Sequence, residues 1–141
     1  MKTQQELNPA KVLVIIEKSQ DGYWVSVEKL PGCYSFGKTV EVALNNVRKA
    51  IAEHISDLSE TGIEVPEIFL HPFEILVKYD IQSLFEAFKF INKSAFAKLA
   101  GINPSLLRQY SQGIAFASDK QKVKISKAIQ LINHNLENAC L

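Results

Sequence analysis

Apolar and polar residues alternate in short runs of strand length through the first part of the chain. The β-branched run Val12 to Ile16 is followed by Asp21-Gly22, a dipeptide typical of tight hairpin turns. A second run, Tyr23 to Glu28, alternates strictly, and a third, Cys33 to Phe36, follows the turn Leu30-Pro31-Gly32. We therefore predict three strands joined by turns. The two faces of the second strand would carry Tyr23, Val25 and Val27 on one side, and Trp24, Ser26 and Glu28 on the other.

After Gly37 the apolar period lengthens to between three and four residues. The stripe consists of Val40, Leu44, Val47, Ile51, Ile55 and Leu58. This spacing predicts a helix of about five turns, with Thr39 as its N-cap and Gly62 at its end. A connector, 63–72, then leads to a fourth strand, 73–79. One helix can cover only one face of a β-β-β-α-β sheet, so the other face needs solvent or a partner.

From Asp80 onward the apolar residues recur only at helical spacing. We predict a helix over 81–88, a second between Asn92 and Gly101, and a third from Pro104 to Gly113, capped by Asn103. A last long helix would begin near Ser118 or Asp119 and carry Val123, Ile125, Ala128, Ile129, Ile132 and Leu136. The chain is therefore predicted to be α+β, with an α/β domain at 1–79 and an all-α domain of about four helices at 80–141.

The pattern from Phe96 to Gly113 contains the residues that a helix-turn-helix requires. Ala97 is small enough for two helices to cross, Gly101 suits a left-handed turn, and Ile102 can fill the corner. Leu107 and Tyr110 would face inward. The outward face of the third helix would carry Pro104, Ser105, Arg108, Gln109 and Gln112. Such a polar face suits the major groove of DNA, and the alternative is a helical hairpin that packs on the first domain or mediates dimerisation.

The two predicted domains carry opposite net charge. Residues 1–79 hold 8 Lys and Arg against 11 Asp and Glu, a net charge of −3, whereas residues 80–141 hold 8 against 4, a net charge of +4. A basic domain suits phosphate backbones, and an acidic domain suits a basic partner. The last helix begins with a cluster of lysines that form either a solvated face or phosphate contacts: Lys120, Lys122, Lys124 and Lys127.

The composition is that of a globular protein, with 47% hydrophobic and 22% charged residues. No apolar run approaches the roughly 20 residues that a bilayer-spanning helix needs. The start, Met1 to Pro9, is polar and lacks an apolar signal core. We therefore expect a soluble, cytoplasmic protein that binds no membrane. Cys33 and Cys140 fit a reducing compartment without pairing.

The residue types needed for catalysis or metal binding are present but scattered. Metal-dependent nucleases need several clustered carboxylates, and no pair of acidic residues in 1–79 has a telling spacing. His54, His71 and His134 lie far from one another and from the cysteines, so the spacing of a zinc site is absent. We expect neither enzymatic activity nor a metal or cofactor.

Several short motifs between Val14 and Pro66 point to a known family. They are Asp21-Gly22-Tyr23-Trp24-Val25, Leu30-Pro31-Gly32-Cys33, Gly37-x-Thr39, Ala43 and Gly62-x-x-Val65-Pro66. These motifs resemble HicB-type antitoxins of bacterial toxin–antitoxin pairs. The resemblance implies a truncated RNase H-like unit that binds and blocks a small basic ribonuclease, the HicA-type toxin. Residues 80–141 resemble the XRE-like, repressor-type helix-turn-helix of a subset of this family, which implies repression of the protein's own operon.

The chain departs from these patterns at a few positions. Lys29 and Lys38 stand where HicB-type proteins often carry acidic residues, which removes negative charge from a surface expected to face a basic toxin. Lys93 and Pro104 stand where repressor relatives often place Gln. Lys93 can still reach a phosphate, whereas Pro104 offers no hydrogen bond to a base. Base discrimination would therefore rest on Ser105, Arg108 and Gln109.

These observations give two sets of candidate residues. The predicted partner-binding residues are Tyr23, Trp24, Glu28, Tyr34 and Phe36, although Trp24 could equally pack at a sheet edge. The predicted DNA-binding residues are Lys93, Ser94, Lys98, Ser105, Arg108, Gln109 and Gln112. We expect a homodimer or homotetramer that binds a two-fold operator in double-stranded DNA. The alternatives are a transcriptional regulator that senses a small ligand or another protein without a toxin, and an antitoxin that binds protein only.

Overall fold

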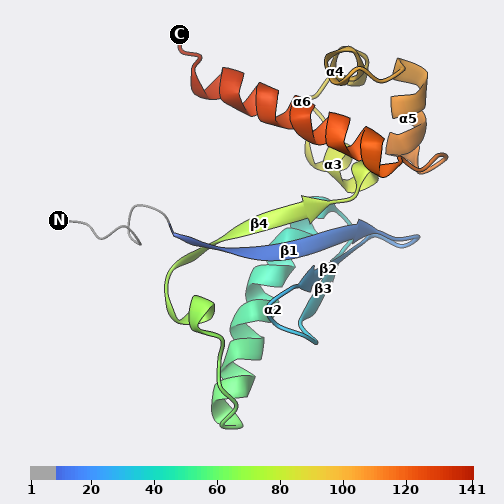
Figure 1. Ribbon diagram of the computed structural model, residues 1–141. Helices are drawn as coiled ribbons and strands as arrows, with labels where there is room; N and C mark the ends of the chain where they lie inside the picture. The colour runs from blue at the N-terminus through green and yellow to red at the C-terminus, as the bar shows by residue number, and fades with distance from the viewer. Residues whose placement is uncertain (1–8) are drawn as a thin grey trace. The chain divides into compact units, whose positions relative to one another are not determined.

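The computed structural model describes residues 9–141 (Figure 1). Most of the polar start Met1 to Pro9 lies outside the described residues. The fold is mixed α+β, as predicted, and the described residues divide into two compact units between Ser83 and Leu84. We call these the first unit and the second unit and describe each by itself. The division falls inside the helix that follows the last strand, shortly after the change of periodicity at Asp80.

The first unit is built on one mixed sheet, which Figure 1 shows with a single long helix on one side. Its strands within the described residues are β1 (Ala10–Lys18), β2 (Tyr23–Val27), β3 (Tyr34–Gly37) and β4 (Phe73–Tyr79), in the order β3-β2-β1-β4. The β1–β2 and β2–β3 pairs are antiparallel, as tight turns require, whereas β1 and β4 are parallel. A parallel pair needs a long crossover, which the helix and the following connector supply.

Helix α2 (Val40–Glu60) forms this crossover. The Thr39 side chain accepts a hydrogen bond from the Val42 N–H, so Thr39 is the N-cap that the sequence predicted. The helix ends at Glu60 with Thr61 as its C-cap, and Gly62 follows with a φ of 74°, a left-handed conformation that glycine adopts without a steric penalty. The connector that we predicted as irregular contains a short 3-10 helix, η1 (Glu67–Leu70).

The core of the first unit lies between the sheet and α2. Strand pairing sets Val14 opposite Val27 and Ile16 opposite Val25, and all of these side chains are buried. Helix α2 covers them with a buried stripe of small and β-branched residues: Val40, Ala43, Val47 and Ile51. The predicted alternation of β2 is confirmed, because Tyr23, Val25 and Val27 are buried on the helix side. The opposite side of the sheet therefore faces away from α2.

The regular elements of the second unit are all helices. Its described helices are α3 (Ile81–Ala87, which begins in the first unit), α4 (Lys93–Ala100), α5 (Pro104–Gln112) and α6 (Asp119–Glu137). The predicted N-caps Asn92 and Asn103 are confirmed, because their side-chain oxygens accept backbone N–H groups of the first turns. Ser118 caps α6 in the same way, so this helix begins at Asp119, one of its two predicted starting residues. The core includes an edge-to-face pair of Phe85 and Phe96, with ring centroids 5.4 Å apart.

No helix in the described part of the chain is both long and apolar enough to cross a membrane.

Candidate partner-binding face and nucleic-acid interface

The sheet face opposite α2 carries a cluster of aromatic side chains. Trp24 on β2 and Phe36 on β3 are cross-strand partners, with ring centroids 5.0 Å apart. Tyr34 lies on the same face of β3, two residues from Phe36. Trp24 is 52% exposed and Tyr34 is 61% exposed, so these large rings are only partly covered. Exposed aromatic side chains that lie together on a rigid sheet are typical of binding surfaces.

The structure brings Trp24, Tyr34 and Phe36 together, whereas the other two predicted partner-binding residues, Glu28 and Tyr23, lie outside this cluster. Glu28 is exposed directly after β2, and its N–H donates to the Leu13 carbonyl at 3.1 Å, which keeps it beside β1. Tyr23 is buried on the opposite, helix-covered face, where the Lys18 ammonium lies 4.9 Å from its ring centroid. Tyr23 therefore does not belong to the exposed cluster, because neighbouring residues of a strand point to opposite faces.

Strand pairing extends this face across β1 and β4. Leu13 and Ile15 lie on it, and the parallel pairing sets Leu76 of β4 beside Leu13. Leu76 is 49% exposed and was not among the predicted residues. The predicted strand 73–79 could have identified Leu76, because alternation sets Leu76 on the face opposite Ile75 and Val77. In the structure, Ile75 and Val77 are indeed more buried than their neighbours. We call Leu13, Ile15, Trp24, Tyr34, Phe36 and Leu76 the open sheet face.

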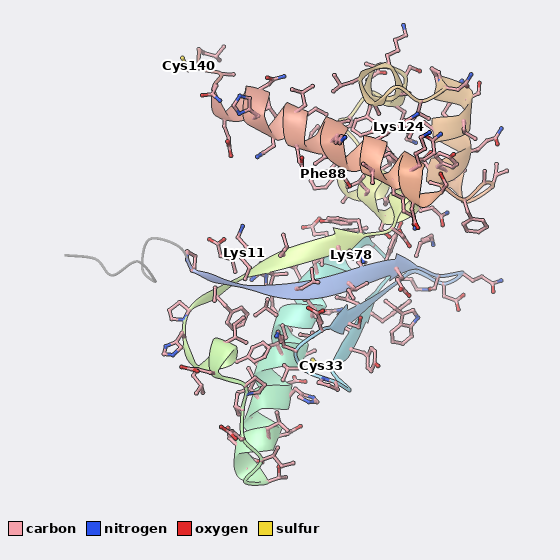
Figure 2. All side chains as sticks on the ribbon, in the orientation of Figure 1. Lys11, Cys33, Lys78, Phe88, Lys124 and Cys140 are labelled. Atoms are coloured by element: carbon pink, nitrogen blue, oxygen red, sulfur yellow. The ribbon has the colours of Figure 1, made fainter. Side chains whose placement is uncertain are left out.

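Charged side chains border the open sheet face. Glu17 is the cross-strand partner of Trp24, and Glu74 lies opposite Lys11 where β4 pairs with β1. Figure 2 labels Lys11 and Lys78 on β1 and β4, on the side of the sheet away from α2. An apolar centre with charges at its border is the composition of a protein–protein interface.

A shallow hollow of about 170 Å³ lies between α2 and the start of β3. Its lining consists of Gly32, Cys33, Tyr34, Ala50, Glu53, His54 and Asp57. Pockets that enclose small ligands usually have roughly 300–1,000 Å³. The hollow is smaller than this range, so it gives no support to a ligand-sensing function.

In the second unit, Arg108 joins the two helices α4 and α5. Its guanidinium donates to the Ser94 Oγ on α4 at 3.3 Å and to the Ser105 Oγ on α5 at 3.3 Å. A guanidinium has five N–H donors, so these two bonds leave three for a ligand. The structure therefore brings together three of the predicted DNA-binding residues at the exposed surface. The two hydroxyl groups also hold the planar group in place before any ligand binds.

Local sequence explains the short turn that joins α4 to α5. Gly101 ends α4 with a φ of 72°, and the Ile102 N–H donates back to the Ala97 carbonyl at 2.9 Å. The Ile102 side chain is buried, as predicted for the residue that fills the corner. Asn103 then starts α5, because its Oδ1 accepts the N–H groups of Ser105 and Leu106.

The other predicted DNA-binding residues are more loosely placed. Gln109 and Gln112 are exposed on the same side of α5 as Arg108, opposite the buried Leu107 and Tyr110. Lys98 is exposed in the last turn of α4. Lys93 is half-buried, and its ammonium lies 6.0 Å from the centroid of the Phe85 ring.

Among the residues that the structure describes, two ionisable groups have shifted pKa values, and both lie in the first unit. Burial raises the pKa of the Cys33 thiol, and burial also raises the pKa of the Tyr79 hydroxyl. A raised thiol pKa lowers the thiolate population, which is the reactive form of cysteine. Among the described residues there is no cluster of three or more His, Cys, Asp or Glu side chains that could hold a metal ion.

Comparison with known proteins identifies relatives of the N-terminal part of the chain. Residues 12–100 match the family described as HicB-like antitoxin of bacterial toxin–antitoxin systems. This match includes the described sheet from Val12 onward, together with α2, α3 and α4, and ends before α5. The open sheet face therefore lies within the matched residues, whereas Arg108 lies outside them.

Similar proteins occur in a phage and in archaea. An uncharacterised 14.9 kDa protein from the rep–hol intergenic region of Haemophilus phage HP1 is 44% identical over 54 residues, which cover 38% of this chain and 41% of the phage protein. A UPF0150 protein of Thermoplasma acidophilum is 44% identical over 57 residues, 40% of this chain and 83% of the archaeal protein. A UPF0150 protein of Archaeoglobus fulgidus is 32% identical over 65 residues, 41% of this chain and 94% of that protein.

Proposed function

The chain belongs to the HicB-like antitoxin family of bacterial toxin–antitoxin systems, and we propose that it binds and neutralises a small basic ribonuclease toxin of the HicA type and represses its own operon. The family is not generally one of enzymes, and we propose that this chain has no catalytic activity of its own. We further propose that it acts in the cytoplasm, where such a toxin would meet its RNA substrates.

The single observation that carries the antitoxin role is the open sheet face within the family match. The strands Tyr23–Val27 and Tyr34–Gly37 present Trp24, Tyr34 and Phe36 on a surface that α2 leaves uncovered. Partly exposed aromatic rings on a rigid sheet supply large contact area at a low entropic cost. The net charge of −3 over residues 1–79 favours a basic partner, because unlike charges speed association.

Toxin neutralisation is tested by growth of cells that express the small basic protein encoded beside this chain. Co-expression of the wild-type chain should restore growth, whereas Trp24→Ala at the same expression level should not. Val42→Ala is the matched control, because Val42 is an exposed apolar residue on α2, in the same unit but not on the sheet. Full rescue by a Trp24→Ala, Phe36→Ala double variant would exclude the open sheet face as the toxin site.

The repressor role is supported by the α4–α5 pair, which we propose is a helix-turn-helix of the XRE type. Arg108 and Gln109 would contact base edges, with Ser105 beside them, and Lys93 and Lys98 would contact phosphates. Ser94 would support Arg108 through its hydrogen bond, and Gln112 would extend the contact along α5. The net charge of +4 over residues 80–141 favours a polyanion. A homodimer or homotetramer would place two such helices about one DNA turn apart.

Operator binding is tested by titrating the full chain into the duplex upstream of its own gene and into a scrambled duplex, across a salt series. Replacing Arg108 by Ala should weaken specific binding by about 5- to 150-fold, which corresponds to the loss of one bidentate base contact. Arg48→Ala is the matched control, because Arg48 is an exposed arginine of α2 in the first unit. Equal affinity for both duplexes at every salt concentration would leave an antitoxin that binds protein only.

A further inference from the structure

The loop between α5 and α6, residues 113–118, presents apolar side chains at the surface of the second unit. Ile114 is 70% exposed and Phe116 is 90% exposed. The intervening Ala115 and the following Ala117 are half-buried, so the alternation directs the two larger side chains outward. Figure 1 shows this loop projecting beyond the ends of the two helices that it joins. We call residues 113–118 the apolar loop, because neighbouring exposed apolar side chains of this size are typical of a binding surface.

Hydrogen bonds hold the apolar loop at both ends. Gly113 ends α5 with a φ of 75°, and the Ile114 N–H donates to the Gln109 carbonyl at 3.0 Å. At the other end, the Ser118 hydroxyl accepts the Gln121 N–H at 3.2 Å and caps α6. The loop is therefore fixed to the end of α5, and its exposed side chains keep a set position relative to the outward face of that helix.

The charges around the apolar loop favour a polyanion as its partner. Residues 104–127, which include α5, the loop and the first half of α6, contain five Lys and Arg and a single acidic residue, Asp119. The basic residues are Arg108, Lys120, Lys122, Lys124 and Lys127. Among the described residues, none of them takes part in an ion pair. A basic toxin would be repelled here, whereas DNA offers phosphates to the cations and apolar base surfaces to the rings.

The length of α5 indicates where the apolar loop would meet DNA. A recognition helix contacts base edges with its N-terminal residues, which on α5 include Ser105 and Arg108. Its nine residues make a helix about 13.5 Å long, and the major groove of B-DNA is about 12 Å wide. The C-terminal end of α5 therefore reaches the sugar–phosphate backbone that borders the groove. The apolar loop continues from that end and would lie beside the adjacent minor groove.

We propose that Phe116 is an apolar wedge, which enters the minor groove next to the major groove that α5 contacts and partly unstacks a base step there. Phenylalanine is one of the residues that act in this way, and such insertion kinks a duplex by about 20–90°. A benzyl side chain has no group that could bond to a phosphate, so contact with the backbone alone gives it no role. Ile114, beside it on the apolar loop, packs against the neighbouring sugar.

The wedge gives the protein a second source of sequence preference. Pyrimidine–purine steps such as TA and CA are the most easily unstacked, whereas A-tracts are stiff. Phe116 therefore favours a flexible step at a position outside the bases that Arg108 and Gln109 would contact. This inference rests on the proposed repressor function and goes beyond it, because it assigns a kink in the operator and a preference for its flanking bases to one residue.

The kink is tested with the full chain and an operator duplex that carries a fluorescent donor and acceptor at its two ends. Binding of the wild type should raise energy transfer, because a kink brings the ends closer together. Phe116→Ala should lose most of this increase but bind within about tenfold of the wild type, since the cost of unstacking disappears together with the contact. Phe90→Ala is the matched control, because Phe90 is an 83% exposed phenylalanine of the same unit outside the apolar loop.

The flanking preference is tested by randomising the base pairs beside each half-site and sequencing the duplexes that the protein retains. The wild type should enrich TA or CA over A-tract steps at one flanking position by about tenfold. Phe116→Ala should lose this enrichment and keep the preference for the half-site. Phe116→Lys should bind at least as tightly as the wild type, through the added cation, but without the kink or the flanking preference.

Four outcomes would overturn the wedge. An operator that stays straight with the wild type, or is equally kinked by Phe116→Ala, would exclude it and leave the repressor function intact. An equal loss of the kink in Phe90→Ala would show that the effect does not belong to the apolar loop. Loss of affinity of Phe116→Ala for the small basic protein encoded beside this chain, with operator binding and bending unchanged, would assign the apolar loop to a protein partner. A wild-type chain that binds no operator would overturn the wedge and the repressor function together.

Discussion

Gly37 shows how closely the backbone of the first unit is packed at the level of single residues. It ends β3 where the first turn of α2 passes over it, and a Cβ built on Gly37 would lie 2.7 Å from the Ala43 Cα. Real Cβ atoms do not approach a backbone atom so closely. The position therefore needs glycine for space, and the Gly37-x-Thr39 motif joins this close approach to the N-cap of the helix.

Replacing Gly37 by Ala should destabilise the protein by about 1–3 kcal/mol or more, because the backbone of α2 must move to admit the methyl group. Urea unfolding followed by circular dichroism measures this loss. Gly62→Asn is the matched control, since Gly62 is left-handed but has no neighbour within 4 Å, and asparagine tolerates that conformation. Equal stability of the Gly37→Ala variant and the wild type would mean that β3 and α2 are not packed as described.

The two cysteines differ in chemical reactivity because their surroundings differ. Cys33 is buried, and burial raises the pKa of its thiol, so little thiolate is present near pH 7. Cys140 is exposed. We predict that a thiol reagent labels Cys140 rapidly in the native protein and reaches Cys33 only on unfolding. A Cys140→Ser variant should therefore be almost unreactive until urea is added. Rapid labelling of that variant would show that the first unit opens readily around β3.

At the scale of the elements, the N-caps determine where the helices of the second unit begin. Asn103 accepts two N–H groups at the start of α5, at 2.9 and 3.3 Å, directly after the turn formed by Gly101 and Ile102. Replacing Asn103 by Ala should cost about 1 kcal/mol, within a usual range of roughly 0.5–2 kcal/mol for lost N-caps. Thermal unfolding measures it.

The control variant for Asn103→Ala is Asn45→Ala, which we do not expect to lower the stability of the protein. Asn45 is exposed in the second turn of α2, where alanine is the better helix former, so Asn45→Ala should leave stability unchanged or slightly raised. If Asn103→Ala is as stable as Asn45→Ala, the cap of α5 contributes nothing, and the orientation of Arg108 would need another explanation.

The elements also show what periodicity predicts and what it leaves undetermined. Alternation in Tyr23 to Glu28 was sufficient to separate the buried from the exposed face of β2, because side chains on a strand alternate strictly. Caps and glycines were sufficient to place both ends of α2, α4 and α5, because the orphan N–H and C=O groups require particular residues there. The parallel pairing that sets Leu76 beside Leu13 was not predicted, because register between distant strands depends on tertiary packing.

Contacts between residues far apart in the chain likewise could not be predicted from the sequence pattern. Arg108 and Ser94 were both candidate DNA-binding residues, but their hydrogen bond depends on how α4 and α5 cross. Tyr23 was predicted to be a partner-binding residue, although the alternation of its own strand sets it on the buried face. A strict application of the predicted alternation would have left it out of the exposed cluster.

At the scale of the whole molecule, the two parts of the chain differ in net charge and in the surfaces for which we propose different partners. Residues 1–79 carry a net charge of −3 and include the open sheet face, and residues 80–141 carry +4 and include Arg108. We therefore expect binding of DNA to weaken steeply with salt, through counterion release. Binding of the toxin should weaken less, because its aromatic contacts are not electrostatic.

The salt dependence gives a prediction for the full chain. Operator affinity should fall by several orders of magnitude, up to about 10³- to 10⁵-fold between 50 and 200 mM salt if six or more phosphates are contacted. Lys98→Ala should reduce the slope by about one unit without changing the preference for the operator over a scrambled duplex. A flat salt response would contradict the assignment of the basic part of the chain to DNA.

The central claim, that this HicB-like chain holds a toxin on its open sheet face, is tested most directly by calorimetric titration of the small basic protein encoded beside it into the full chain. The wild type should bind tightly, Trp24→Ala should raise the dissociation constant by about 30-fold or more, as loss of an aromatic anchor does, and Arg108→Ala should leave it unchanged. Wild-type affinity in Trp24→Ala, or weakening by Arg108→Ala alone, would contradict the account and move the partner surface away from the sheet.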